Sequence, residues 1–211
     1  MSEGEIDVDE LRTELDQIKA AMGIDERYEG ATTLWLLFGL AVPVAAALSQ
    51  YVVLERLPQW YHTLIWVGVL GGGAALYVAF ADDAPDEGWT SEGKPAIWVQ
   101  FVVVYLAAFP LQAVAAAYVG DLGYVAESAL VLSIIVVVIS VAYGVLGASL
   151  RAYYVRRRDR RVFYVGTLWM VALGVTIPQH ATLETWGFAA FGACYFAYAM
   201  AAYLVLRGGE R

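Results

Sequence analysis

The sequence predicts an all-α, polytopic integral membrane protein built as a bundle of six transmembrane helices. Six runs of 22 to 26 residues contain no Asp, Glu, Lys or Arg, and a helix needs roughly 20 apolar residues to cross a bilayer. The 13 basic and 21 acidic residues of the chain all lie outside these runs. A helix in a water-soluble protein would instead keep a polar face. The six runs are therefore expected to lie in lipid.

The chain divides into three parts. Residues 1–29 form an acidic tail, residues 30–207 form the membrane domain, and residues 208–211 form the C-terminus. The expected spans cover about 32–54, 60–81, 96–118, 128–150, 162–180 and 185–206. Two connections are long: 82–94, which is acidic, and 151–161, which is basic and is expected to prolong the fourth helix.

Basic residues are distributed very unevenly between the two sides of a six-span protein. Only Arg56 lies on one side. The cations on the other side are Arg12, Lys19, Arg27, Lys94, Arg151, Arg156, Arg157, Arg158, Arg160, Arg161, Arg207 and Arg211. Because loops rich in Lys and Arg stay inside the cell, we expect a cytoplasmic-membrane protein with both termini in the cytoplasm.

The acidic tail contains one amphipathic pattern, which predicts a helix over residues 8–22. Asp7 is a suitable N-cap and Gly23 a suitable stop. Apolar side chains recur at alternating intervals of three and four, at Val8, Leu11, Leu15, Ile18 and Met22. A helix of this length is marginal alone in water, so it needs a partner surface. That surface is the chain's own bundle, a second copy or another protein.

Small residues spaced four apart predict where spans pack closely, because they let helix backbones approach. They form stripes in the second, fourth and sixth spans: Gly68 and Gly72; Ser140 and Gly144; Ala189, Ala193 and Ala197. The closest approach is expected between the second and sixth spans, through Gly68, Gly72, Ala193 and Ala197.

Three prolines within spans, Pro43, Pro110 and Pro178, are candidate helix breaks. Proline lacks the N–H that would bond the carbonyl four residues earlier. Broken helices with free backbone dipoles bind substrates in many transporters. A kink whose freed groups bond a neighbouring helix is the ordinary alternative.

Two histidines and a glutamate form a weak candidate metal set. His62, His180 and Glu184 all fall near the outer ends of their spans, and His180 and Glu184 are four residues apart. Two histidines and one carboxylate suit a transition metal. The sequence does not show that the three helix ends are adjacent, and a histidine bonded to water or a loop carbonyl is the ordinary alternative. We expect no metal and no other cofactor.

The sequence lacks the residues that several classes of membrane protein require. No lysine lies in any span, which excludes a retinal Schiff base, and the single cysteine, Cys194, excludes a CxxC redox motif. The basic segment Tyr153–Arg161 has two interpretations, an orientation signal or a site for anionic lipid headgroups. The excess of Asp, Glu and Arg over Lys resembles halophilic protein composition.

These observations favour a non-enzymatic accessory or regulatory membrane protein. Its tail helix would contact a partner protein or another copy, and no nucleic-acid partner is expected. The alternative is a small transporter or permease subunit that uses the proline-broken helices.

Overall fold

A computed structural model of the protein describes residues 14, 31–80, 97–152 and 155–207. All regular elements in these ranges are helical: α2 (Ala31–Leu54), α3 (Trp60–Phe80), α4 (Ile97–Leu106), α5 (Ala108–Val119), α6 (Tyr124–Ser149), α7 (Arg157–Thr176), the 3₁₀ turn η2 (Ile177–Gln179) and α8 (Ala181–Arg207). Five stretches are long and apolar enough to cross a membrane: Trp35–Leu54, Val102–Val119, Tyr124–Ser149, Arg157–Gln179 and Ala181–Arg207. Helix α3 adds a further uncharged helix of 21 residues.

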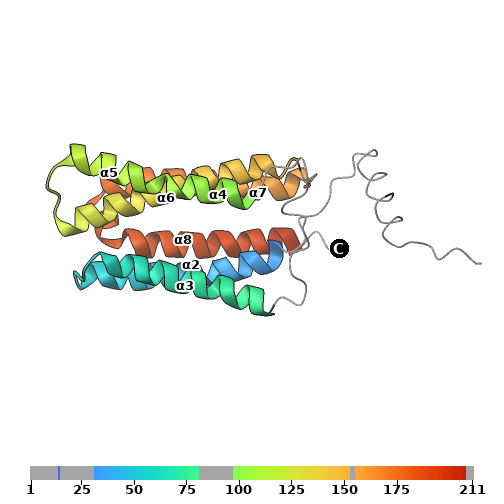
Figure 1. The fold of residues 1–211 in the computed structure, drawn as a ribbon, viewed down its shortest axis with the longest axis horizontal. Coiled ribbons are helices and arrows are strands. Elements are labelled where there is room, and N and C mark those ends of the chain that lie inside the picture. The colour runs from blue at the N-terminus through green and yellow to red at the C-terminus, as the bar shows by residue number, and fades with distance from the viewer. Residues whose placement is uncertain (1–13, 15–30, 81–96, 153–154, 208–211) are drawn as a thin grey trace, which may run out of the picture.

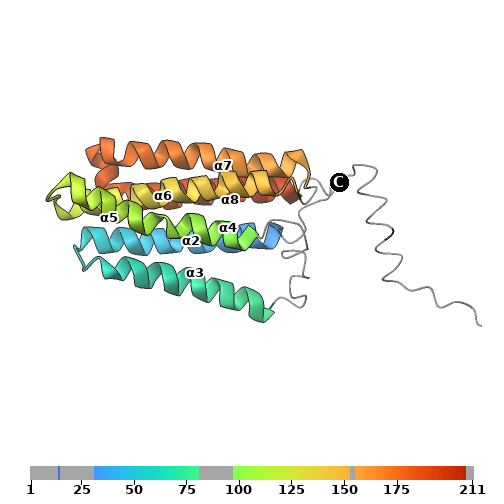
Figure 2. The ribbon, with the colours of Figure 1, turned by 45° about the horizontal axis from the view of Figure 1, so that its top comes forward.

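The helices lie side by side along one long axis (Figures 1 and 2). Helix α8 packs on α2, which also contacts α3, while α6 pairs with α7 and contacts α4, α5 and α8. Helix α3 and the α4–α5 segment therefore lie on the outside of the bundle. Their large side chains are mostly exposed, as at Leu64, Val67, Val103 and Phe109. Such exposure is expected of side chains that face lipid.

Helices α2 and α8 approach closely where small residues meet. A Cβ added at Gly39 of α2 would lie 3.0 Å from the Cβ of Ala199 in α8. A Cβ added at Gly192 of α8 would lie 2.9 Å from the Cβ of Ala46 and 3.5 Å from the Cα of Pro43. Lipid supplies no hydrophobic force between helices, so this backbone contact holds the pair together by van der Waals attraction.

Helices α6 and α7 use the same kind of contact. A Cβ added at Gly174 of α7 would lie 2.8 Å from Cγ2 of Val137 and 3.2 Å from the carbonyl oxygen of Ser133. A Cβ added at Gly144 of α6 would lie 3.3 Å from Oγ1 of Thr167. No larger residue fits at Gly174 without moving the helices apart.

Aromatic side chains fill the centre between α2, α6, α7 and α8. The ring cluster consists of Trp35, Tyr143, Phe163, Trp169, Phe191, Tyr195 and Tyr198. The hydroxyls of Tyr143 and Tyr195 lie 2.7 Å apart and share a hydrogen bond. The Tyr198 hydroxyl donates to the carbonyl oxygen of Val162 at 2.9 Å. Buried tyrosine hydroxyls thus find partners within the cluster, as apolar surroundings require.

The expected close approach of the second and sixth spans is wrong. A Cβ added at Gly68 or Gly72 would meet no atom of the described chain within 4 Å. Ala193 and Ala197 of α8 are exposed. The spacing of small residues marks a face of a helix, but it does not say which helix meets that face. The closest contacts join α2 to α8 and α6 to α7 instead.

The connection between the fourth and fifth spans also differs from expectation. Helix α6 ends at Ser149, and the chain tightens into a turn in which the Arg151 N–H donates to the carbonyl oxygen of Ala148. Arg156 is extended, with φ −50° and ψ 139°, and α7 begins at Arg157. Basic residues therefore start the next helix rather than prolong α6. Of the tail helix expected over residues 8–22, the structure describes only Glu14, which is helical and exposed.

Gly166 of α7 offers a test of this packing. A Cβ there would collide with the Tyr198 hydroxyl and lie 2.8 Å from Cδ1 of Tyr143. We expect Gly166→Ala to lower the free energy of unfolding by about 1–3 kcal/mol, because two packed rings must shift. Gly72→Ala, whose Cβ meets open space, is the matched control. Thermal unfolding of the purified protein in detergent measures both, and equal stability of the two variants would contradict the packing.

Candidate functional site

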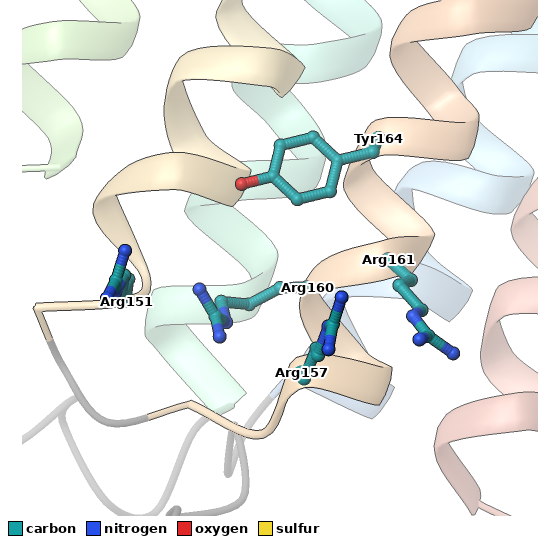
Figure 3. A pocket seen from close by; sticks show the side chains of 5 residues that line it. All are labelled: Arg151, Arg157, Arg160, Arg161 and Tyr164. Carbon is teal, nitrogen blue, oxygen red and sulfur yellow. The ribbon is translucent and has the colours of Figure 1, made fainter.

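A strongly basic pocket lies where α6 ends and α7 begins. It has a volume of about 510 Å³, and its lining residues are Arg151, Arg157, Arg160, Arg161 and Tyr164. Figure 3 shows Arg160 between Arg151 and Arg157, with the Tyr164 ring above them and its hydroxyl directed toward α6. Four guanidinium groups and no carboxylate line this space, so it suits an anion.

The pocket follows from the spacing of residues on α7. Positions 157, 160, 161 and 164 fall at i, i+3, i+4 and i+7, which places them on one face of a helix. Arg158 lies on another face, where its Nη2 donates to the carbonyl oxygen of Val205 at the end of α8. The turn between α6 and α7 brings Arg151 to the same pocket. This turn and one face of α7 therefore supply the four arginines.

Close packing and a buried donor characterise the pocket. A Cβ added at Gly147 of α6 would lie 3.2 Å from Cε1 of Tyr164, so a larger residue there would press on the tyrosine ring. Nε of Arg160 is buried and has no hydrogen-bond partner within the described chain. The α7 N-terminus adds a partial positive charge, and the first turn of this helix also contains the buried Asp159.

Guanidinium groups bind phosphate and carboxylate through paired N–H donors with a matching fork geometry. An aromatic hydroxyl beside them adds one more donor at the level where Tyr favours the membrane interface. The pocket is suited to recognise an anion. Its arginines stay protonated and therefore offer no general base.

A second polar feature lies near the opposite end of the bundle, where Gln50 repairs a kink in α8. Trp186 has non-helical angles, φ −109° and ψ 15°. The Gln50 side chain donates from Nε2 to the carbonyl oxygen of Thr185 at 2.7 Å and accepts the N–H of Ala189 at 3.0 Å. In a regular helix these two backbone groups would bond each other. The amide of α2 thus replaces one bond of α8.

The proline positions differ in their effect. Helix α2 runs through Pro43 without a break, so the break expected there is absent. Helix α8 packs on the Pro43 backbone at Gly192, and such packing stabilises a proline within a membrane helix. In contrast, α4 ends at Leu106, four residues before Pro110, and Pro178 lies in the 3₁₀ turn after α7.

The weak metal set is not assembled. His62 stacks on Phe188 with ring centroids 4.8 Å apart and an angle of 8° between planes. His180 is exposed, and its carbonyl oxygen accepts the N–H of Glu184 at 2.9 Å. Within the part of the chain that the structure describes, no three His, Cys, Asp or Glu side chains are placed to bind one metal ion.

Other candidate residues lie apart from the pocket. Ser140 is fully buried one turn before Gly144 in α6, and the Ala189 N–H serves the Gln50 bridge. The tail residues Val8, Leu11, Leu15, Ile18 and Met22 lie outside the described residues. The arginines are visible in the sequence, but their common face was not recognised there. The i, i+3, i+4, i+7 spacing of residues 157, 160, 161 and 164 was the available signal.

We expect Gln50→Leu to destabilise the protein by about 1–3 kcal/mol, because the Thr185 carbonyl and Ala189 N–H would lose their partner away from water. Gln179→Leu is the control, since Gln179 is exposed and bonds only Val175 of its own turn. Chemical denaturation in detergent measures both variants. If Gln50→Leu is no less stable than Gln179→Leu, the bridge is not a structural element.

Comparisons with known protein families, with curated proteins and with solved structures found no match to this chain. The residues and their geometry are therefore the basis of the functional proposal below.

Proposed function

We propose that the protein is a non-enzymatic accessory or regulatory component of the cytoplasmic membrane, a six-span bundle that acts through its cytoplasmic end. The supporting observation is that the interior of the bundle is filled with side chains, whereas one end of the bundle has a basic pocket. Met170, Ile177 and Phe191 are almost completely buried in the interior, and the ring cluster closes the space around them. Recognition of a charged molecule is available at the arginine pocket instead.

The proposed orientation is supported by the arrangement of the helix ends. The start of α2, the α6–α7 turn and the end of α8 lie at one end of the bundle (Figure 1). That end holds Arg151, the arginines of α7 and Arg207. The opposite end has only Arg56 as a cation. Both termini are therefore cytoplasmic in this proposal, since the basic end stays inside.

Cysteine labelling tests the orientation. In a Cys194→Ser background, cysteines substituted for Glu55, Asp121 and Glu184 should react with a membrane-impermeant reagent in intact cells. A cysteine at Asp86 should react only after the cells are opened, because the second connection is cytoplasmic. The inverse labelling pattern would refute the orientation.

The tail helix is the proposed contact with a partner protein or a second copy. Burial of each large apolar side chain contributes about 1.5–3 kcal/mol. Replacing Leu11 and Leu15 with Asp should therefore weaken the complex at least about a hundredfold, while the membrane bundle stays folded. Size-exclusion chromatography and cross-linking in native membranes measure the complex, and helicity in detergent checks the fold.

A matched control is Glu10→Ala with Glu14→Ala, which alters the tail without changing its apolar stripe. If the Leu variant keeps the same complexes as this control, the tail is not an interaction element.

A transporter or permease subunit is the second candidate, and one observation favours it. The third expected span is divided into α4 and α5 at Ala107, near the point where Pro110 removes a backbone bond. Ala107 itself keeps right-handed helical angles, φ −63° and ψ −18°. Against it, Gln100 does not line an open path: the Ser149 hydroxyl donates to its Oε1 across α4 and α6. Leu106 and Phe109 beside the break are exposed on the outer surface. The accessory role is the better supported of the two.

A further inference from the structure

The position of the arginine pocket along α7 indicates its depth relative to the membrane. It opens beside α7 at the point where the helix changes from charged residues to an apolar run that begins at Val162. Tyr164 is the third residue of this run and still lines the pocket. A ligand held here is therefore in reach of the layer in which lipid headgroups lie, and not only of free solution.

The pocket has an excess of positive charge. Four arginines line its volume of about 510 Å³, and like charges in one small space repel one another. The acid in this turn of α7, Asp159, is buried and does not line the pocket. The half-buried Arg160 also leaves its Nε without a partner within the described chain. An anion with several acceptor oxygens would relieve both costs. A phosphate group offers such oxygens in the geometry that guanidinium forks match.

We propose that the pocket binds the phosphate of an anionic membrane lipid from the cytoplasmic leaflet, with Arg151, Arg157 and Arg160 as the phosphate ligands. Tyr164 donates its hydroxyl to the headgroup from the apolar side. This inference rests on the orientation proposed above, and it names the ligand through which the cytoplasmic end would sense or be held by the membrane surface.

The experiment compares two double variants with equal loss of charge at the same end of the molecule. Arg157→Gln with Arg160→Gln removes two pocket cations. Arg158→Gln with Arg207→Gln removes two cations outside it, whose guanidinium groups bond Val205 and Tyr203. Full-length protein is reconstituted in phosphatidylcholine vesicles with a minor fraction of phosphatidylglycerol, and native mass spectrometry counts the lipids retained.

The wild type and the Arg158/Arg207 variant should retain phosphatidylglycerol in preference to phosphatidylcholine. The Arg157/Arg160 variant should retain it about thirtyfold less strongly, from two lost contacts at modest ionic strength. Equal retention by the two double variants would overturn the proposal. It would show that phosphatidylglycerol responds to the net positive charge of this end and not to the pocket.

Two further arms distinguish the chemistry and the source. Arg157→Lys with Arg160→Lys keeps the charge but loses the fork, and should retain less lipid than the wild type. Retention equal to the wild type would overturn a site built for phosphate. Inorganic phosphate titrated into protein in pure phosphatidylcholine should bind weakly. If it binds through the same arginines while phosphatidylglycerol is not retained, a soluble phosphate compound is the ligand and the lipid proposal is wrong.

Lipid retention is measured on the purified chain without a protein partner. A negative result therefore leaves the accessory role untouched, whereas a failed tail experiment leaves lipid binding untouched.

Discussion

Direct contact between helix backbones at small residues is the interaction on which this bundle depends. Lipid surrounds the helices with groups as apolar as their own side chains, so packing rather than water exclusion must hold them together. Gly39 and Gly192 bring α2 against α8, and Gly144 and Gly174 bring α6 against α7. The two tight pairs then enclose the aromatic cluster. In α3, Cβ atoms added at Gly68, Gly71 and Gly72 would meet no other helix of the described chain within 4 Å, and this helix remains on the outside with the α4–α5 segment.

The same setting explains why several polar groups in the interior form hydrogen bonds between helices. A backbone group without a partner in lipid costs several kcal/mol. The kink at Trp186 would leave two such groups free, and the Gln50 amide satisfies both from another helix. Tyr143, Tyr195 and Tyr198 also bond across helices. These bonds link the pairs that glycine contacts bring together, so they fix which helices are neighbours.

The sequence predicts the parts of this fold that depend on one helix at a time. The uncharged runs predict the bounds of α2, α3, α6 and α8 to within a few residues, because the length of such a run reflects membrane thickness. The partner of each helix depends on three-dimensional contact instead: Gly68 and Gly72 have the expected spacing but meet open space. The basic residues were visible, but the pocket was not, since it depends on α7 beginning at Arg157 and not at 162.

This shift of a helix start by five residues gives one set of arginines two compatible roles. In the proposed orientation, the five arginines of 156–161 keep this segment on the cytoplasmic side during insertion, and any spacing would suffice for that. Once helical, Arg157, Arg160 and Arg161 share one face, while Arg158 turns to the end of α8. Orientation requires only the charges, whereas a phosphate site requires their geometry. Replacing Arg157 and Arg160 with lysine keeps the charges but removes the planar guanidinium groups. These substitutions therefore separate the orientation role from phosphate binding.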